Sequence, residues 1–192
     1  MFTVNYPIDD SIEIDGGLYT VNRSFDNVLR FFDLLNDEEL DDITKTHLGI
    51  NMLLGVSFLC PLEESRRIFD QLYEAYFVPE EEEVPLDRAG NPMPASKREK
   101  KEQSICFVHD AEAIFASFVQ AYNIDLVEEQ GKLHWLKFKA LLNGLPDETL
   151  LARIVDIRTS RLPTGKGSAE RRKEMLELKR RHALPGANVE EE

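Results

Sequence analysis

The residues of this sequence that could do chemistry are few and scattered. His134 stands beside Trp135, the only tryptophan, and such a pair would suit a general base in an aromatic pocket. No nucleophile accompanies the pair in the local pattern, so we interpret His134 as a packing residue. The sequence also lacks the common metalloprotease, hydrolase and nucleotide-binding motifs. We therefore expect no catalytic residue, no metal site, no cofactor and no enzymatic activity. The other histidines are too scattered for a recognisable metal motif: His47, His109 and His182.

Two further short patterns have a functional and an ordinary interpretation. The segment GKGS at 165–168 resembles a phosphate loop, but it lacks the upstream glycine and the preceding apolar strand of such a loop. Cys60 and Cys106 lie among apolar or aromatic neighbours and at no CxxC spacing, which favours reduced thiols over a zinc site. Asp and Glu are so abundant that paired carboxylates carry no information without geometry.

The least ordinary feature is a basic helix near the C-terminal end. Residues 161–185 hold 8 basic and 3 acidic residues, whereas residues 1–60 hold 3 basic and 11 acidic ones. The helix is open to three interpretations: a solvated surface helix, a contact for an acidic protein surface, or a nucleic-acid contact. It has no aromatic residue between its charges, which weakens the case for single-strand binding. The candidate partner-binding residues are Arg171, Arg172, Met175, Leu178, Lys179, Arg180 and Arg181.

The composition excludes several classes of protein. The chain has 192 residues, of which 42% are hydrophobic, so a sizeable core can be buried. No apolar run approaches the roughly 20 residues that span a bilayer, and the segment MFTVNYPIDD is unlike a signal peptide. The net charge of −13 should repel DNA and anionic membranes. We expect a cytoplasmic protein with neither a nucleic-acid nor a membrane partner.

The elements that must position these residues are mainly helical. Residues 11–22 alternate around Asp15-Gly16-Gly17, which predicts a β-hairpin that packs on helices or pairs with another chain. Ser24 should cap a first helix, and Asn36 or Asp37 a second helix that includes Leu40. A third helix should follow Pro61 and close before Pro79. Together, residues 1–78 are interpreted as the hairpin plus a helical layer.

Three more helices are predicted between residues 104 and 160. Asp110 can cap the first, Asn123 can end it in the left-handed conformation, and Asp147 should cap the third. We expect these helices to form an aromatic core around Trp135, packed on residues 1–78 as one domain. Residues 79–103 combine glutamates, prolines, glycines and lysines, which is typical of a flexible loop or linker.

The remaining segment, 161–192, is interpreted as a charged tail with a helix at about 168–182. Met175, Leu178 and His182 should form its narrow apolar stripe. The predicted fold class is therefore mainly α: a small helical bundle with an N-terminal β-hairpin, a long mobile central loop and a basic C-terminal helix.

An ordered set of residues between 109 and 158 resembles a known family, the bacteriophage gene product 15 family of tailed phages and prophages of Gram-positive bacteria. The similarity extends to the Ile-Asp-Gly hairpin at 14–16 and to the basic end at 179–185. The chain departs from the family pattern at Asp156-Ile157, where a Gly-Tyr pair is common, and at Leu136, where a second aromatic is common. The matching residues are Asp110, Gln120, Tyr122, Ile124-Asp125-Leu126, His134-Trp135, Lys137-Phe138, Ala140-Leu141, Gly144-Leu145-Pro146 and Arg158.

The resemblance implies a non-enzymatic tail assembly chaperone of a siphovirus or prophage. Such a protein binds the tape-measure protein, or another tail protein, in the host bacterial cytoplasm and is absent from the mature virion; self-association is compatible with this role. The alternative is a minor structural protein of the virion, a connector or completion protein, which would share the small helical body. An enzyme is the third and weakest interpretation, since no catalytic constellation is present.

Overall fold

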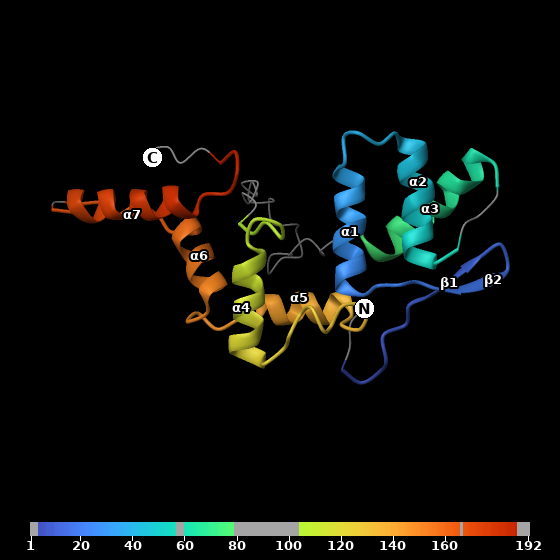
Figure 1. The fold of residues 1–192 in the computed structure, drawn as a ribbon, viewed down its shortest axis with the longest axis horizontal. Coiled ribbons are helices and arrows are strands. Elements are labelled where there is room, and N and C mark those ends of the chain that lie inside the picture. Colours follow the sequence, from blue (N-terminus) through green and yellow to red (C-terminus); the bar gives the residue numbers. More distant parts are fainter. Residues whose placement is uncertain (1–3, 57–59, 79–103, 166, 188–192) are drawn as a thin grey trace, which may run out of the picture. The chain divides into compact units, whose positions relative to one another are not determined.

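The computed structural model describes residues 4–56, 60–78, 104–165 and 167–187 (Figure 1). Within them the chain forms an antiparallel hairpin and seven α-helices, which confirms the mainly α fold class. The expected loop at 79–103 lies outside the described residues. The elements are β1 (Ser11–Ile14), β2 (Gly17–Thr20), α1 (Phe25–Asn36), α2 (Asp42–Leu54), α3 (Leu62–Tyr76), α4 (Ala111–Tyr122), α5 (Trp135–Asn143), α6 (Leu150–Thr159) and α7 (Ala169–His182).

The chain divides into two compact units. The first comprises residues 1–96 and 130–138, and the second comprises residues 97–129 and 139–192. The division falls within α5, whose first four residues belong to the first unit. The units are described separately below, and the expectation of one combined domain stays a prediction.

The hairpin of the first unit is the element that the sequence predicts most closely. Asp15 and Gly16 both have positive φ, 49° and 78°, and they connect the paired residues Ile14 and Gly17. Two central residues with positive φ form the tight turn whose twist matches that of the strands. Ile12 and Ile14 on β1 are buried, so one face of the hairpin enters the core, as expected.

Helix α3 holds the hairpin in place through three hydrogen bonds. The Gln71 amide donates to the carbonyl of Glu13 at 3.0 Å, and the Tyr76 hydroxyl donates to the carbonyl of Ser11 at 2.9 Å. Arg67 pairs with Asp15 at the turn at 2.7 Å. Isolated hairpins are marginal in water, so these contacts and the buried isoleucines confirm that the hairpin packs on helices.

The core of the first unit lies between the hairpin and helices α1, α2 and α3. Figure 1 shows α1 and α2 side by side. Phe31 is fully buried, and its ring lies 5.0 Å from that of Phe77 and 5.9 Å from that of Phe69. Gly49 of α2 faces these rings, and a Cβ placed on it would lie 2.7 Å from Phe69. The buried apolar members are Ile12, Ile14, Val21, Phe31, Ile50, Leu53, Leu54, Ile68 and Leu72.

The segment that precedes α5 is clamped to the segment that precedes α1. The N–H of Phe25 donates to the carbonyl of Leu133 at 2.9 Å, and the N–H of Trp135 donates to the carbonyl of Arg23 at 2.8 Å. The indole of Trp135 therefore lies in the first unit, 6.1 Å from the ring of Phe32 on α1. The expected aromatic core of the helices at 104–160 around Trp135 stays a prediction, because apolar spacing tells that a face is buried but not which helices cover it.

In the second unit, α4 packs on α6. Ile114 and Phe118 of α4 and Leu151 and Ile154 of α6 are buried. Ser117 is completely buried; its hydroxyl donates to the carbonyl of Ala113 at 2.7 Å and accepts the N–H of Leu151 at 3.0 Å. The Ser117 side chain of α4 thus satisfies a free N–H in the first turn of α6.

The predicted N-terminal caps of two helices are wrong, each because another group bonds the free N–H groups. Helix α2 is capped by Asp41, whose carboxylate accepts the N–H of Thr44 at 2.8 Å, so Leu40 precedes the helix. Asn36 and Asp37 instead close α1. Helix α6 begins after Thr149 rather than Asp147, and Ser117 bonds its first turn.

The other predicted caps lie at the expected positions, but the two N-terminal ones make other hydrogen bonds than expected. Asn123 ends α4 in the left-handed conformation, with φ of 55°. Ser24 and Asp110 stand at the predicted N-terminal positions, but neither side chain bonds a free N–H of its helix. Ser24 donates to the side chain of Asn22 at 2.9 Å, and Asp110 has another role, described next.

Candidate functional site

Helix α7 carries every residue of the partner-binding prediction. Gly165 and Gly167 have φ of 113° and 84°, so the chain turns there before the helix begins. The hydroxyl of Ser168 donates to the carbonyl of Gly165 at 2.8 Å, which stabilises that turn rather than the helix. The predicted helix at 168–182 is thereby confirmed as α7.

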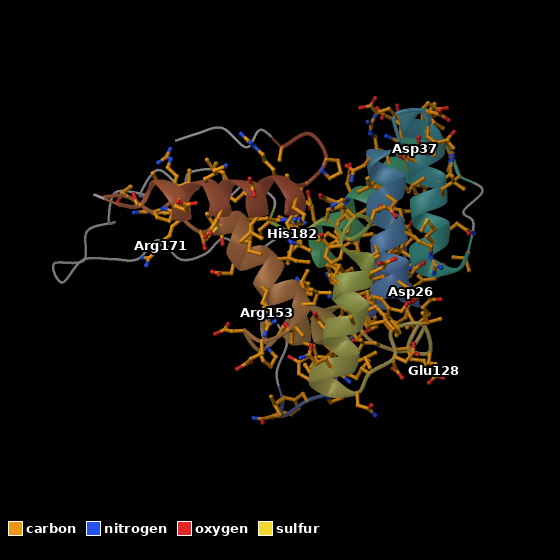
Figure 2. All side chains as sticks on the ribbon, turned by 60° about the vertical axis from the view of Figure 1, so that its left-hand side comes forward. Asp26, Asp37, Glu128, Arg153, Arg171 and His182 are labelled. Atoms are coloured by element: carbon orange, nitrogen blue, oxygen red, sulfur yellow. The ribbon has the colours of Figure 1, made fainter. Side chains whose placement is uncertain are left out.

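The structure divides the predicted residues between two sides of α7. Arg171, Leu178, Arg180 and Arg181 are exposed. The remaining three, Arg172, Met175 and Lys179, are half-buried. Figure 2 shows Arg171 and His182 toward opposite ends of this helix.

The inner side of α7 differs from the predicted stripe. Its buried residue is Leu176, at 7% exposure, which the sequence reasoning missed because the neighbouring Met175 and Leu178 matched a helical spacing. The ammonium of Lys179 donates to the carbonyl of Arg158 at 2.9 Å. Lys179 is therefore a contact between α7 and α6.

Arg158, at the end of α6, is the centre of this contact. Its guanidinium forms two hydrogen bonds of 2.7 Å with the carboxylate of Asp110, and both side chains are almost completely buried. It also donates to the carbonyl of His182 at 2.6 Å and to that of Ser104 at 2.9 Å. One side chain thus joins α6, the start of α4, the end of α7 and the segment before α4.

Asp110 is ionised in this arrangement. Burial alone would raise the pKa of its carboxyl group, but the hydrogen bonds from Arg158 and from the N–H of Cys106, with the charge of Arg158, lower the pKa below its usual value. The buried carboxylate of Asp110 is paired and hydrogen-bonded through both oxygens, so it holds structural elements together. Neither oxygen is free for acid–base chemistry.

Helix α4 presents an apolar stripe to solvent. Phe115 is 36% exposed and Val119 is 40% exposed, one helical turn apart. Val108, in the turn before the helix, is 76% exposed, and Ala111 and Ala116 are also exposed. We call Val108, Ala111, Phe115, Ala116 and Val119 the α4 stripe. Because α6 leaves these side chains exposed, the stripe is suited to contact with another apolar surface.

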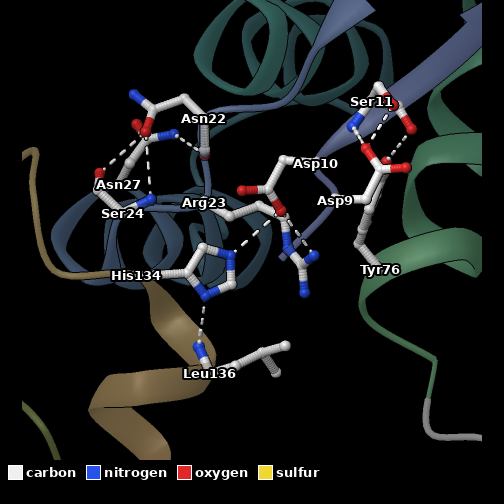
Figure 3. A network of polar contacts seen from close by, with 10 residues as sticks. All are labelled: Asp9, Asp10, Ser11, Asn22, Arg23, Ser24, Asn27, Tyr76, His134 and Leu136. Atoms are coloured by element: carbon white, nitrogen blue, oxygen red, sulfur yellow. Dashed lines mark hydrogen bonds and ion pairs between the residues drawn. The ribbon is translucent and has the colours of Figure 1, made fainter. Parts of the chain in front are cut away.

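In the first unit, both ring nitrogens of His134 take part in hydrogen bonds (Figure 3). Its Nδ1 accepts the N–H of Leu136 at 3.0 Å, so the proton resides on Nε2, which donates to Asp10 at 3.1 Å. Burial lowers the pKa of His134, and the hydrogen bond and charge of Asp10 offset this only in part. Because both ring nitrogens are bonded, His134 holds the start of α5 and has no nitrogen free for a substrate.

Arg23 completes this network from the segment before α1. Its guanidinium pairs with Asp10 at 2.8 Å and lies 4.6 Å from the centre of the Tyr76 ring. Arg23 also lines a cavity of about 360 Å³ with Tyr6, Asp9 and Leu136, but its buried Nε lacks a hydrogen-bond partner and is closed to solvent. A ligand in this cavity would meet Asp9 and the paired guanidinium together, which favours neither an anion nor a cation.

No group of three or more His, Cys, Asp or Glu side chains among the described residues is arranged to hold a metal ion. No helix in the described part of the chain is long and apolar enough to cross a membrane.

Comparison with known proteins identifies the family. The family model described as bacteriophage Gp15 protein matches residues 5–184, nearly the whole chain. The chain belongs to the bacteriophage Gp15 family. It is therefore a phage protein, and the resemblance inferred from the sequence is confirmed. No curated protein and no solved structure matches it.

The residues that resembled the Gp15 family occupy the joints just described. Asp110 and Arg158 form the buried ion pair of the second unit. The hydroxyl of Tyr122 donates to the carbonyl of Leu141 at 2.9 Å, and so joins the end of α4 to α5. His134 and Trp135 clamp the start of α5 to the first unit. These members of the matching set therefore hold the fold.

Proposed function

We propose that this member of the Gp15 family is a tail assembly chaperone that binds the tape-measure protein in the host cytoplasm, performs no catalysis and is absent from the mature virion. Family membership supports the phage context. The observation that carries the binding role is the α4 stripe, which places exposed apolar side chains along one helix.

A tape-measure protein is long and helical, and it aggregates unless its apolar faces are covered. An apolar helical face can pack against such a segment in the manner of a helix-in-groove complex. Between Val108 and Val119 the exposed acidic residue is Glu112, since Asp110 is buried and paired with Arg158, so the desolvation cost of covering the stripe is small.

Co-expression with the tape-measure protein tests this proposal. The wild-type chain should raise the soluble fraction of the tape-measure protein and should be recovered with it. The double variant Phe115→Ser, Val119→Ser should lose both effects, because it removes the largest side chains of the stripe. The matched control is Val127→Ser, Leu150→Ser, which changes two exposed apolar residues of the same unit outside the stripe.

Two results would contradict the proposal. One is a wild-type chain that neither binds nor solubilises the tape-measure protein. The other is detection of the chain at a fixed ratio in purified virions by mass spectrometry, which would favour the connector or completion protein.

A further inference from the structure

The outward face of α7 has a defined pattern of charge and apolar surface. Arg171, Glu174, Leu178 and Arg181 follow one another at spacings of three and four residues, and all four are exposed. Such spacing places them in one row along the helix. The two arginines are ten positions apart, so they stand about 15 Å apart along the axis, with the apolar side chain of Leu178 between them.

Four cations of α7 are without an ion pair among the described residues. Arg171, Lys173, Arg180 and Arg181 are exposed, and none forms an ion pair with another described residue. Lys179, on the inner side, is bonded to Arg158. Lys179 therefore contacts α6, whereas Arg171, Lys173, Arg180 and Arg181 are exposed to solvent.

The inner joint gives the outer row a fixed place on the second unit. Arg158 bonds the carbonyl of His182 at the C-terminal end of α7, and Leu176 is buried. A helix fixed at this end presents its outward side chains in a constant register, which a partner helix can match. The charge of the helix also differs from that of the chain, with 6 basic and 3 acidic residues against a net charge of −13.

We propose that the outward row of α7 is a second docking surface, which takes an acidic amphipathic helix of the protein client. Acidic side chains about ten residues apart would face Arg171 and Arg181, and apolar side chains would cover Leu178. The position opposite Glu174 would be neutral or basic. The inference rests on the proposed function, since it names the chemistry of the client helix.

Charge complementarity favours a protein over a nucleic acid. The row alternates basic, acidic, apolar and basic residues, whereas a phosphate backbone rewards uninterrupted cations. The row also lacks an aromatic side chain on which a base would stack.

A peptide-binding experiment with the full chain tests the docking surface. The probe is a fluorescent helical peptide of about four turns, with leucines on one face and a glutamate near each end. A second peptide replaces the glutamates by lysines. Fluorescence anisotropy should show that the wild-type chain binds the acidic peptide and not the basic one, with an affinity that falls as salt is raised.

Charge reversal on α7 should invert this preference. Arg171→Glu, Arg181→Glu should weaken binding of the acidic peptide about tenfold or more and should allow the basic peptide to bind. The matched control is Arg153→Glu, Arg161→Glu, which makes the same change at two exposed arginines elsewhere in the unit and should leave affinity within about twofold. Circular dichroism on each variant confirms that α7 stays helical.

The outcomes separate this inference from the proposed function. Equal binding of the acidic peptide to the wild type and the α7 variant overturns the inference, as does binding of a DNA duplex that the same variant abolishes. If the α7 variant still solubilises the tape-measure protein as well as the wild type does, the proposed function stands and the docking surface fails. If the wild type does not bind the tape-measure protein, the proposed function fails, whereas inverted peptide preference still supports an acidic helical partner for α7.

Discussion

Arg158 of α6 bonds three other segments of the second unit, through Ser104, Asp110 and His182. Replacing it by methionine keeps much of its volume but leaves the Asp110 carboxylate, 3% exposed, without its counterion. We expect Arg158→Met to lower the free energy of unfolding by about 3–5 kcal/mol, the usual cost of breaking a buried pair. Urea unfolding measures it. The control Arg153→Met alters an exposed arginine of the same helix and should change stability by about 0.5 kcal/mol at most. Equal effects of the two changes would mean that the pair is not a joint.

Gly49 is the second residue on which packing depends. A methyl group there would lie 2.7 Å from the ring of Phe69 and 3.0 Å from that of Phe31, and both rings are packed in the core. Alanine has a higher helix propensity than glycine. We nevertheless expect Gly49→Ala to destabilise the first unit by about 1–3 kcal/mol, because the added methyl group overpacks the core. Thermal unfolding should show a lower melting temperature. His47→Ala, at an exposed position of α2, should leave it nearly unchanged. A stabilised Gly49→Ala protein would contradict the close approach of α2 to these rings.

His134 should make stability depend on pH. Because its pKa is lowered in the folded protein, the unfolded chain binds the proton more readily. Stability is then fully present above the unfolded pKa of about 6.5 and falls as the pH decreases below it. The ionised Asp26 and Asp110, whose pKa values are also lowered, lose their contribution only in more acidic solution, below about pH 4.

Urea midpoints measured between pH 7.5 and 5 check this prediction. A protonated Nδ1 would face the N–H of Leu136, so the hydrogen bond that starts α5 would be lost. His47→Ala should keep the pH dependence, because His47 is exposed. A flat profile in the wild type, or one that disappears in His47→Ala, would show that His134 does not cause it.

At the scale of elements, α7 should be separable from the body of its unit. It buries one apolar side chain, Leu176, and the Arg158–Asp110 pair does not require it. Removal of residues 168–192 should therefore lower the melting temperature by only a few degrees and weaken binding of the acidic peptide and of the client. Calorimetry and a pull-down measure the two effects. Unfolding of the truncated chain would mean that α7 belongs to the core.

The sequence predicts elements better than it predicts the bonds between them. The turn at Asp15-Gly16 and the end of α4 at Asn123 follow from local backbone preferences, so they could be read from residue types. The cap of α6 could not, because the side chain that satisfies it, Ser117, comes from 34 residues away. The same limit affected Asp110, whose type suits a helix cap but whose carboxylate bonds Arg158.

The candidate site shows the same division. Residue types placed the basic helix correctly, but only the structure separates Lys179, which bonds Arg158, from Arg171 and Arg181, which face solvent. The α4 stripe had no distinct signal, since Phe115 and Val119 have the same spacing as buried positions of that helix. Periodicity gives the width of an apolar face and cannot tell how much of it a neighbour covers.

At the scale of the whole molecule, the charge is unequally divided. The residues of the first unit include 20 acidic and 8 basic ones, whereas those of the second include 16 and 15. The first unit therefore carries nearly all of the net charge of −13. Self-repulsion keeps such surfaces apart in solution and disfavours anionic partners. Both proposed docking surfaces, the α4 stripe and the outward row of α7, lie in the nearly neutral unit, where an acidic client helix meets the least repulsion.

The two possible positions of the Trp135 ring predict that different helices loosen when the ring is removed. If its ring belonged to a core of the helices at 104–160, Trp135→Ala would loosen α4 and α6. The structure places the ring against Phe32 and Phe138 in the first unit, at 7% exposure. We therefore expect Trp135→Ala to cost about 3–5 kcal/mol and to reduce hydrogen-exchange protection mainly in α1, α2 and β1.

The reciprocal change supplies the control for this expectation. Phe118 is fully buried in the second unit, so Phe118→Ala should cost a similar amount, about 3–5 kcal/mol, and should reduce protection mainly in α4 and α6. Hydrogen exchange read by mass spectrometry locates each loss along the chain. If Trp135→Ala instead opened α4 and α6 and left α1 protected, the ring would stabilise the second unit, and the discontinuous first unit, built from residues 1–96 and 130–138, would be incorrect. Protection lost equally in both units by both variants would mean that the chain unfolds as one cooperative domain, as its sequence alone predicts.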